Sequence, residues 1–195
     1  IAKNLNINTI VICPPHLMDA WEDYTTLAQI PKTVISRGRI NDAFKKEIKT
    51  RENLIIIDEA QYYRNDQTVD YLNLHELCKN NKVILLSATP FNNKPQDIFN
   101  MTKLFQVPSR STIQTIDNLS ENFKELIKEY NSLKKIITKT PDNLKKIKDK
   151  KNLIATEIRS ILSPIVIRRS RLDLMQIDRY KKDLDLQGIE FPKRK

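Results

Sequence analysis

The chain has 195 residues, of which 39% are hydrophobic, so it is long enough for one compact domain with its own core. Only two residues are glycine, Gly38 and Gly188, which excludes both a G-x-x-x-x-G-K-[ST] phosphate loop and a G-x-G-x-x-G turn. The formal net charge of +10 favours a polyanionic partner, although a lysine-rich solvated surface explains it equally well.

In the first hundred residues, short apolar segments rich in β-branched residues alternate with segments of helical periodicity. We expect strands at 8–13, 33–36, 53–57 and 82–86. We expect helices at 17–27, from 43 to 48, at 68–79 and at 95–105, the first with Leu17, Trp21, Tyr24 and Leu27 on one face. Strands that are apolar on both faces and alternate with helices are typical of a parallel sheet with helices on both sides. The sequence therefore predicts an α/β fold.

After Ser111 the pattern changes to that of a helical hairpin. Apolar residues recur at helical spacing from Phe123 to Ile137 and again up to Ile161, with Thr140 as a helix cap and Pro141 in the first turn. The stretch from Glu121 to Lys151 holds ten lysines against five acidic residues. Most such charge forms the solvated face of a helix, and a nucleic-acid-binding role for the hairpin is the less favoured alternative.

Two other features concern the cellular setting. Cys13 and Cys78 lie far apart and lack the spacing of a metal site, so we expect reduced, buried thiols of an intracellular protein. No signal peptide is visible and no apolar run approaches the ~20 residues that a membrane helix needs. Because the chain starts at Ile1 without methionine, we expect a piece excised from a longer cytoplasmic protein.

Each predicted strand ends in a polar or proline-marked cluster. These clusters are Pro14-Pro15-His16, Arg37-Gly38-Arg39, Asp58-Glu59 and Ser87-Ala88-Thr89. In parallel sheets, ligands bind beyond the carboxyl ends of the strands, so we expect all four clusters to line one edge.

The adjacent carboxylates of Asp58 and Glu59 suit a site for a nucleotide and its metal ion. Mg²⁺ takes oxygen ligands and keeps several waters, so one carboxylate can hold that shell while the other polarises an attacking water. The alternative is a solvated turn in which an acidic residue caps the next helix. Ser87 and Thr89 can hydrogen-bond to the acidic pair or cap a turn before Pro90, and the two motifs on neighbouring strands are more specific together than apart.

At these motifs the chain resembles the superfamily 2 helicases, and the Swi/Snf-type DNA translocases in particular. Asp58-Glu59-Ala60-Gln61 is similar to the Walker B box, or motif II, and Ser87-Ala88-Thr89 to motif III. Leu85 to Asn93, Ile12 to Leu17 with Trp21, and Ile165 to Leu174 resemble the Swi/Snf forms of motif III, motif Ia and the "LRR-x-K-x-D" segment. The resemblance covers residues 8–106 and 160–175, and the hairpin matches by position only. It implies the first RecA-like ATPase lobe, incomplete because the phosphate loop is lacking.

The resemblance also implies ATP and Mg²⁺ as cofactors and assigns roles to the motif residues. Asp58 binds Mg²⁺ through water, Glu59 is the general base, and Gln61 connects the nucleotide to motif III, where Ser87, Ala88 and Thr89 couple nucleotide state to lobe movement. The residues expected near the DNA backbone are Pro14, Pro15, His16, Arg37, Arg39, Arg168 and Arg169. The last two face the interlobe cleft or DNA, or only pair with carboxylates. Backbone contacts carry no sequence code, so we expect no sequence specificity.

Two departures from the family pattern matter. Gln61 stands where many remodellers have histidine, which fits a bacterial relative better. The phosphate loop and the second lobe with its arginine finger are missing, so we expect the chain alone to be inactive and the complete motor to hydrolyse ATP.

We expect the C-terminal part of the first RecA-like lobe at 1–110 and a helical protrusion at 111–163. A return segment and the start of a linker to the second lobe are expected at 164–195. The alternatives are an RNA helicase, a restriction-enzyme motor lobe, or a non-catalytic nucleic-acid-binding module that uses the hairpin lysines.

Overall fold

The structure, a computed structural model, describes residues 7–45, 52–88, 94–137, 144–167, 177–186 and 188. Its centre is a parallel sheet of four strands in the order β2-β1-β3-β4. The strands are β1 (Thr9–Cys13), β2 (Lys32–Ser36), β3 (Leu54–Ile57) and β4 (Lys82–Leu85). All four lie within one residue of the predicted ranges, and the predicted α/β class is confirmed.

The two central strands form the most deeply buried part of the sheet. Every residue of β1 is buried, and β3 is almost as enclosed. In contrast β4, the outer strand next to β3, is exposed at Lys82 and only partly buried along the rest of its length. The register places Ile12 beside Ile57, and Ile57 beside Leu85. The carboxyl ends of these three strands are therefore level with one another.

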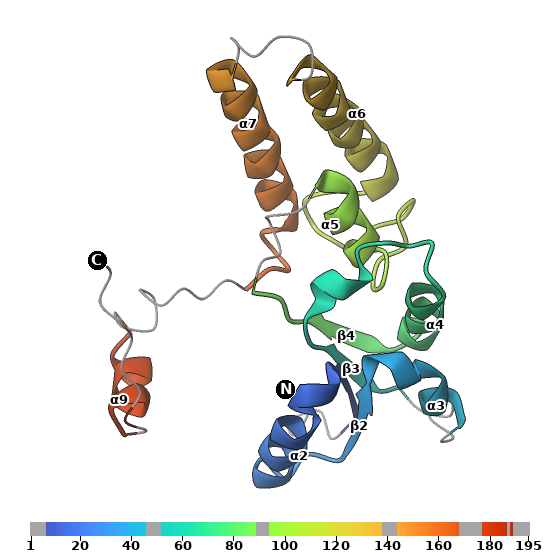
Figure 1. Cartoon of the computed structure of the whole chain (residues 1–195), viewed down its shortest axis with the longest axis vertical. Coiled ribbons are helices and arrows are strands. Elements are labelled where there is room, and N and C mark those ends of the chain that lie inside the picture. The colour runs from blue at the N-terminus through green and yellow to red at the C-terminus, as the bar shows by residue number, and fades with distance from the viewer. Residues whose placement is uncertain are drawn as a thin grey trace.

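The helices of this part cover both faces of the sheet, as predicted. They are α2 (Met18–Leu27), α3 (Ile40–Lys45) and α4 (Val69–Cys78), and short 3-10 turns η1 (Pro15–Leu17), η2 (Arg37–Arg39) and η4 (Ala60–Tyr63) follow β1, β2 and β3. Crossovers between parallel strands are right-handed, which places α2 on one face and α3 with α4 on the other, as Figure 1 shows. The helix α3 also packs against α4.

The strand order places a topological switch point, where an open α/β sheet has its ligand-binding crevice, beyond the carboxyl ends of β1 and β3. The chain leaves the carboxyl end of β1 toward α2 on one face, and it leaves the carboxyl end of neighbouring β3 toward α4 on the other. Such a reversal between adjacent strands separates the loops on the two faces, and ligands of open α/β sheets bind there. The motif residues at the ends of β1 and β3 therefore flank this crevice.

The apolar face predicted for the first helix is largely outside the core. Tyr24 is 60% exposed and Leu27 is 86% exposed, whereas Thr25 is the buried residue of α2. The Thr25 hydroxyl donates a hydrogen bond of 2.6 Å to the backbone oxygen of Trp21, so this polar residue sits against the sheet without an unmet bond. In α4, Leu74 is buried whereas Leu72 is exposed.

The predicted helical hairpin is present beyond the sheet. Helix α5 (Pro95–Thr102) packs against α6 (Leu119–Ile137), and α6 packs against α7 (Leu144–Leu162), while α9 (Asp178–Leu186) is set apart (Figure 1). Phe123 at the base of α6 is fully buried and stacks on Phe99 of α5, with ring centroids 5.2 Å apart. The expected cap at Thr140 and Pro141 lies outside the described residues. No described helix combines the length and apolar character needed to cross a membrane.

Both cysteines are buried and free, as predicted. Burial, together with the nearby carboxylates of Asp58 and Glu22, raises the pKa of the Cys13 thiol to about 11. Burial also raises the pKa of Cys78 to about 12. Both side chains are therefore neutral thiols at physiological pH and act as small apolar core residues.

Candidate functional site

Asp58 lies where β3 ends and is fixed by three hydrogen bonds, one that it donates and two that it accepts. Its backbone N–H donates to the carbonyl oxygen of Ile12 at 2.8 Å, which continues the pairing of β3 with β1. Its Oδ1 accepts the backbone N–H of Glu59 at 2.9 Å, and its Oδ2 accepts the indole N–H of Trp21, also at 2.9 Å. The carboxylate is therefore held at the mouth of the crevice between β1 and β3.

Glu59 follows in a left-handed backbone conformation, with φ of 53° and ψ of 48°. For a residue other than glycine this conformation costs roughly 1–2 kcal/mol. Backbone hydrogen bonds hold the turn, since the N–H of Ala60 donates to the Leu86 oxygen at 2.9 Å and the N–H of Leu86 donates to the Ile57 oxygen at 2.8 Å. From this turn the Glu59 carboxylate accepts a hydrogen bond from the side chain of Gln61.

Gln61 joins Glu59 to the end of β4. The side-chain N–H of Gln61 donates to the Glu59 carboxylate, and its side-chain oxygen accepts the Ser87 hydroxyl at 2.8 Å. An amide suits this position because it carries both a donor for the carboxylate and an acceptor for the hydroxyl. The structure thus brings together Glu59 and Gln61, which follow β3, and Ser87, which follows β4. Ala88 is exposed next to Ser87, and Thr89 lies outside the described residues.

Five of the residues expected to contact nucleic acid lie at the same edge of the sheet. Pro14 is buried at the end of β1, whereas Pro15 and His16 are exposed in η1. The Arg37 guanidinium lies 3.9 Å from the centroid of the Tyr62 ring, and the exposed Arg39 forms an ion pair of 2.7 Å with Asp42. Arg168 and Arg169 lie outside the described residues. The expected common edge of the four clusters is therefore confirmed for the described residues.

Sequence reasoning missed two residues of this site. The sequence places Trp21 on the apolar face of a helix and in the segment that resembles motif Ia. It does not predict the hydrogen bond from the indole to Asp58, which is 37 positions away. Tyr62, directly after the motif II residues, is 55% exposed and carries the Arg37 guanidinium on its ring. The available signal for Trp21 was its rarity, because it is the only tryptophan in the chain.

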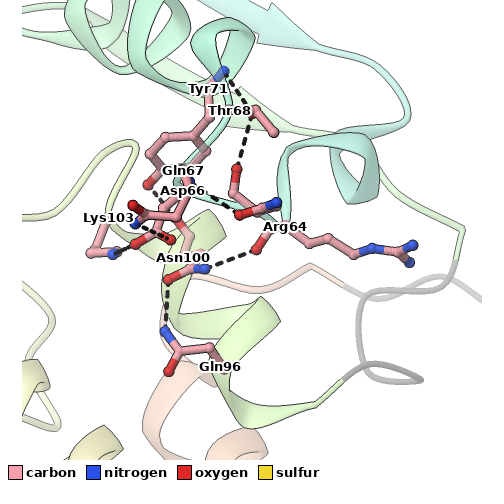
Figure 2. Close-up of polar contacts among 9 residues, drawn as sticks. Arg64, Asp66, Gln67, Thr68, Tyr71, Gln96, Asn100 and Lys103 are labelled. Carbon is pink, nitrogen blue, oxygen red and sulfur yellow. Dashed lines mark hydrogen bonds and ion pairs between the residues drawn. The ribbon is translucent and has the colours of Figure 1, made fainter.

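A second polar network fixes the segment after η4 to α5, as Figure 2 shows. The buried Asn100 donates to the backbone oxygen of Arg64 at 2.8 Å and accepts the side-chain N–H of Gln96 at 2.8 Å. The Tyr71 hydroxyl donates to the backbone oxygen of Asn100 at 2.6 Å. Because α5 also packs on the hairpin, this network connects the surroundings of motif II with α6.

An ion pair closes the same network. Lys103 lies 2.5 Å from Asp66, and both side chains are about a quarter exposed, at 22% and 24%. The hydrogen bond from Lys103 is the main reason that the pKa of Asp66 lies below its usual value, and a bond from Gln67 acts in the same direction.

The carboxylate oxygens of Asp58 fit a magnesium ion that is shared with a nucleotide. Each oxygen of Asp58 accepts one N–H and keeps a lone pair for a water of the metal shell. In the described residues there is no group of three or more histidine, cysteine or acidic side chains that could hold a metal alone. Mg²⁺ is usually held by one or two carboxylates together with substrate phosphates and waters, so this sparse set is appropriate.

Comparisons with known proteins bear on the fold and the family of the chain. No curated protein matches the chain. Among solved structures, the chain is similar to the SWI2/SNF2 ATPase core of Sulfolobus solfataricus in complex with double-stranded DNA, with a TM-score of 0.58, 22% identity and 88% of this chain covered. The chain spans 36% of that protein's length. Its four-stranded parallel sheet thus has the RecA-like fold of a SWI2/SNF2 core.

A family model assigns the chain to a family, which is more specific than the fold. The model of the SNF2-related domain matches residues 24–185, which is most of the chain and includes motif II, the end of β4 and the hairpin. The chain therefore belongs to the SNF2-related domain family, whose members are ATP-hydrolysing motors that remodel or translocate DNA.

Proposed function

We propose that this chain supplies the motif II and motif III half of an ATP site in a motor that moves along double-stranded DNA. The observation that carries the proposal is the continuous set of hydrogen bonds from Ser87 through Gln61 to Glu59, beside Asp58 at the crevice. A solvated helix-capping turn does not need this arrangement, because its carboxylates bond to nearby backbone N–H groups.

Each carboxylate has its own task in this proposal. Asp58 holds waters of the Mg²⁺ shell, in the orientation set by the N–H groups of Trp21 and Glu59. Glu59 accepts the proton of the water that attacks the terminal phosphate of ATP, and Gln61 fixes the direction of its carboxylate. Bound Mg²⁺ neutralises charge on the phosphates. The end of β4 responds to nucleotide state through Ser87.

The DNA-facing part of the proposal rests on exposed groups at the same edge of the sheet. Pro15, His16 and Arg39 are exposed there, and the partly exposed Arg37 lies beside them on the Tyr62 ring. Contacts of these residues to backbone phosphates would carry no sequence code. The solved relative was determined with double-stranded DNA, which favours duplex DNA over RNA as the partner. Comparing the stimulation of ATP hydrolysis by duplex DNA, single-stranded DNA and RNA separates the motor classes.

We further propose the division of the chain into a lobe (1–110), a helical protrusion (111–163) and a linker to a second lobe (164–195). The 195 residues contain no phosphate-binding loop, so the chain alone should show negligible ATP hydrolysis. Robust DNA-stimulated hydrolysis by the isolated chain would overturn that part of the proposal.

The central test is Glu59→Gln in a protein that joins these residues to a phosphate loop and a second lobe. ATP hydrolysis should fall by at least about a hundredfold, since general-base catalysis typically contributes 10²–10⁴-fold, while duplex binding persists. The matched control is Glu76→Gln, an exposed residue of α4 that should leave hydrolysis unchanged. Loss of DNA binding with hydrolysis intact would contradict the assignment.

A further inference from the structure

We infer that Trp21 is a positioning residue that couples the segment Pro15–His16 to the orientation of the Asp58 carboxylate. The inference rests on the proposed function and extends it, because it assigns the connection between the DNA-facing surface and the metal carboxylate to one side chain. Trp21 does not contact the reacting atoms itself. It acts through its hydrogen bond of 2.9 Å to Oδ2 of Asp58.

The path from the surface to Asp58 is short and stiff. The turn η1 closes with the Leu17 N–H donating to the Pro14 oxygen at 3.0 Å, and the Met18 N–H donates to the Pro15 oxygen. Helix α2 starts at Met18, so Trp21 lies in its first turn. A displacement of η1 by a bound phosphate backbone therefore moves the start of α2, and the indole moves with it.

The remainder of α2 is held in place, which concentrates such a movement at its first turn. The buried Thr25 donates to the backbone oxygens of Trp21 and Glu22 at 2.6 and 3.2 Å. Lys32, on β2, forms an ion pair of 2.9 Å with Glu22. The Thr25 bonds lie within the helix, and the Lys32 ion pair ties the middle of the helix to β2, whereas η1 has no buried residue.

The two oxygens of Asp58 differ in what holds them. Oδ1 is bound by the N–H of the next residue in the chain, which moves together with Asp58. Oδ2 is bound by an indole on the far side of the crevice, on an element that follows β1. The indole is a donor only, so this hydrogen bond always runs from Trp21 to Asp58. Movement of α2 relative to β3 therefore changes the direction of the carboxylate.

The first experiment uses tryptophan emission of the 195-residue chain, because Trp21 is its only tryptophan. Short duplex DNA added without nucleotide or metal should shift or quench the emission, since the indole moves against a charged carboxylate. The same addition to Asp58→Asn should give a smaller change. Equal changes in both proteins, or DNA binding with no change in emission, would overturn the inference.

The second experiment measures a complete motor with Trp21→Phe. Loss of a partner that orients a metal-binding carboxylate should raise the Mg²⁺ concentration for half-maximal hydrolysis by roughly 10- to 100-fold. Stimulation by duplex DNA should fall by a similar factor, while duplex affinity stays unchanged. The matched control is Tyr24→Phe, because Tyr24 lies edge-on to Trp21 at 5.9 Å and is mostly exposed.

A second variant separates positioning from packing. Replacing Trp21 by β-(3-benzothienyl)alanine keeps the shape of the ring and removes only the N–H donor. The inference requires this variant to melt like the parent protein and to reproduce the Mg²⁺ and DNA effects of Trp21→Phe. Parent-like Mg²⁺ dependence and DNA stimulation in this variant would overturn it. Glu59→Gln in the same motor separates the two claims. If it abolishes hydrolysis, the proposed function stands even when the Trp21 inference is overturned. If it has no effect on hydrolysis, the proposed function itself fails.

Discussion

The Ser87 hydroxyl donates a hydrogen bond of 2.8 Å to the side-chain oxygen of Gln61, whose N–H donates to the carboxylate of Glu59. This contact crosses from β4 to the turn after β3, so the position of Ser87 depends on where the Glu59 carboxylate points. The strands on either side are joined by backbone pairing, which leaves the side chains as the part that can change with nucleotide state.

Ser87→Ala should therefore weaken DNA-stimulated ATP hydrolysis of a complete motor by up to about tenfold, because one hydrogen bond between neutral groups contributes roughly 1 kcal/mol. Basal hydrolysis should change less, since Gln61 still bonds to Glu59 in that variant. Steady-state ATPase assays with and without duplex DNA measure both quantities. Ser109→Ala, at an exposed serine, is the control. An equal loss of basal and stimulated rates would contradict the coupling role.

The left-handed backbone of Glu59 predicts an unusual order of stability. Glu59→Gly and Glu59→Ala both remove the carboxylate and its bond to Gln61, and they differ only in the presence of a Cβ atom. At φ of 53° the Cβ is costly, so the glycine variant should be more stable than the alanine variant by about 1 kcal/mol. Urea unfolding of the two variants measures the difference in the free energy of unfolding. An alanine variant of equal or greater stability would show that the backbone relaxes.

The ion pair of Asp66 with Lys103 predicts a dependence of stability on pH. The pKa of Asp66 is lowered in the folded chain, mainly by the bond from Lys103. Its contribution to stability is therefore fully present above the unfolded value near 4 and is lost as the pH falls through the lower folded value. Urea unfolding between about pH 2 and 7 should show this loss in the parent and less of it in Asp66→Asn. Lys103→Met should flatten the same part of the curve, and an unchanged curve in both variants would exclude the ion pair as its cause.

Asn100 should matter for stability out of proportion to its size. Asn100→Ala leaves the backbone oxygen of Arg64 without its donor and should cost about 1–3 kcal/mol in the free energy of unfolding. Amide hydrogen exchange should also become faster in η4, because α5 no longer holds the segment that follows it. Gln96→Ala is the comparison, since Gln96 is exposed and its loss leaves the bond from Asn100 to Arg64 intact. Equal costs for the two variants would argue against a holding role for Asn100.

The sheet was predictable because its signals are local. Each strand is a short run of β-branched residues that ends at proline, arginine, acidic or hydroxyl-bearing residues, and parallel pairing brings those ends together without further information. The periodicity of α2 was visible too, but periodicity does not say what covers a face. Tyr24 and Leu27 share the helical spacing of Leu17 and are nevertheless exposed.

The site was predictable only as far as sequence order determines it. The placement of Glu59, Gln61 and Ser87 near one another follows from neighbouring strand ends. The left-handed turn at Glu59 had no signal, because glutamate is not a residue that favours this conformation. The bond of Trp21 to Asp58 depends on how α2 lies across the sheet, a result of tertiary packing that no short segment encodes.

The partly buried outer strand has a practical consequence for work with the chain in solution. In the part of the chain that the structure describes, no strand pairs with the outer side of β4, so the backbone groups on that side are left without a strand partner. Such an edge is a template for pairing with another molecule. Because an open edge can pair with another molecule, dilute preparations that contain salt are the appropriate starting point for crystallisation or spectroscopy of the isolated chain.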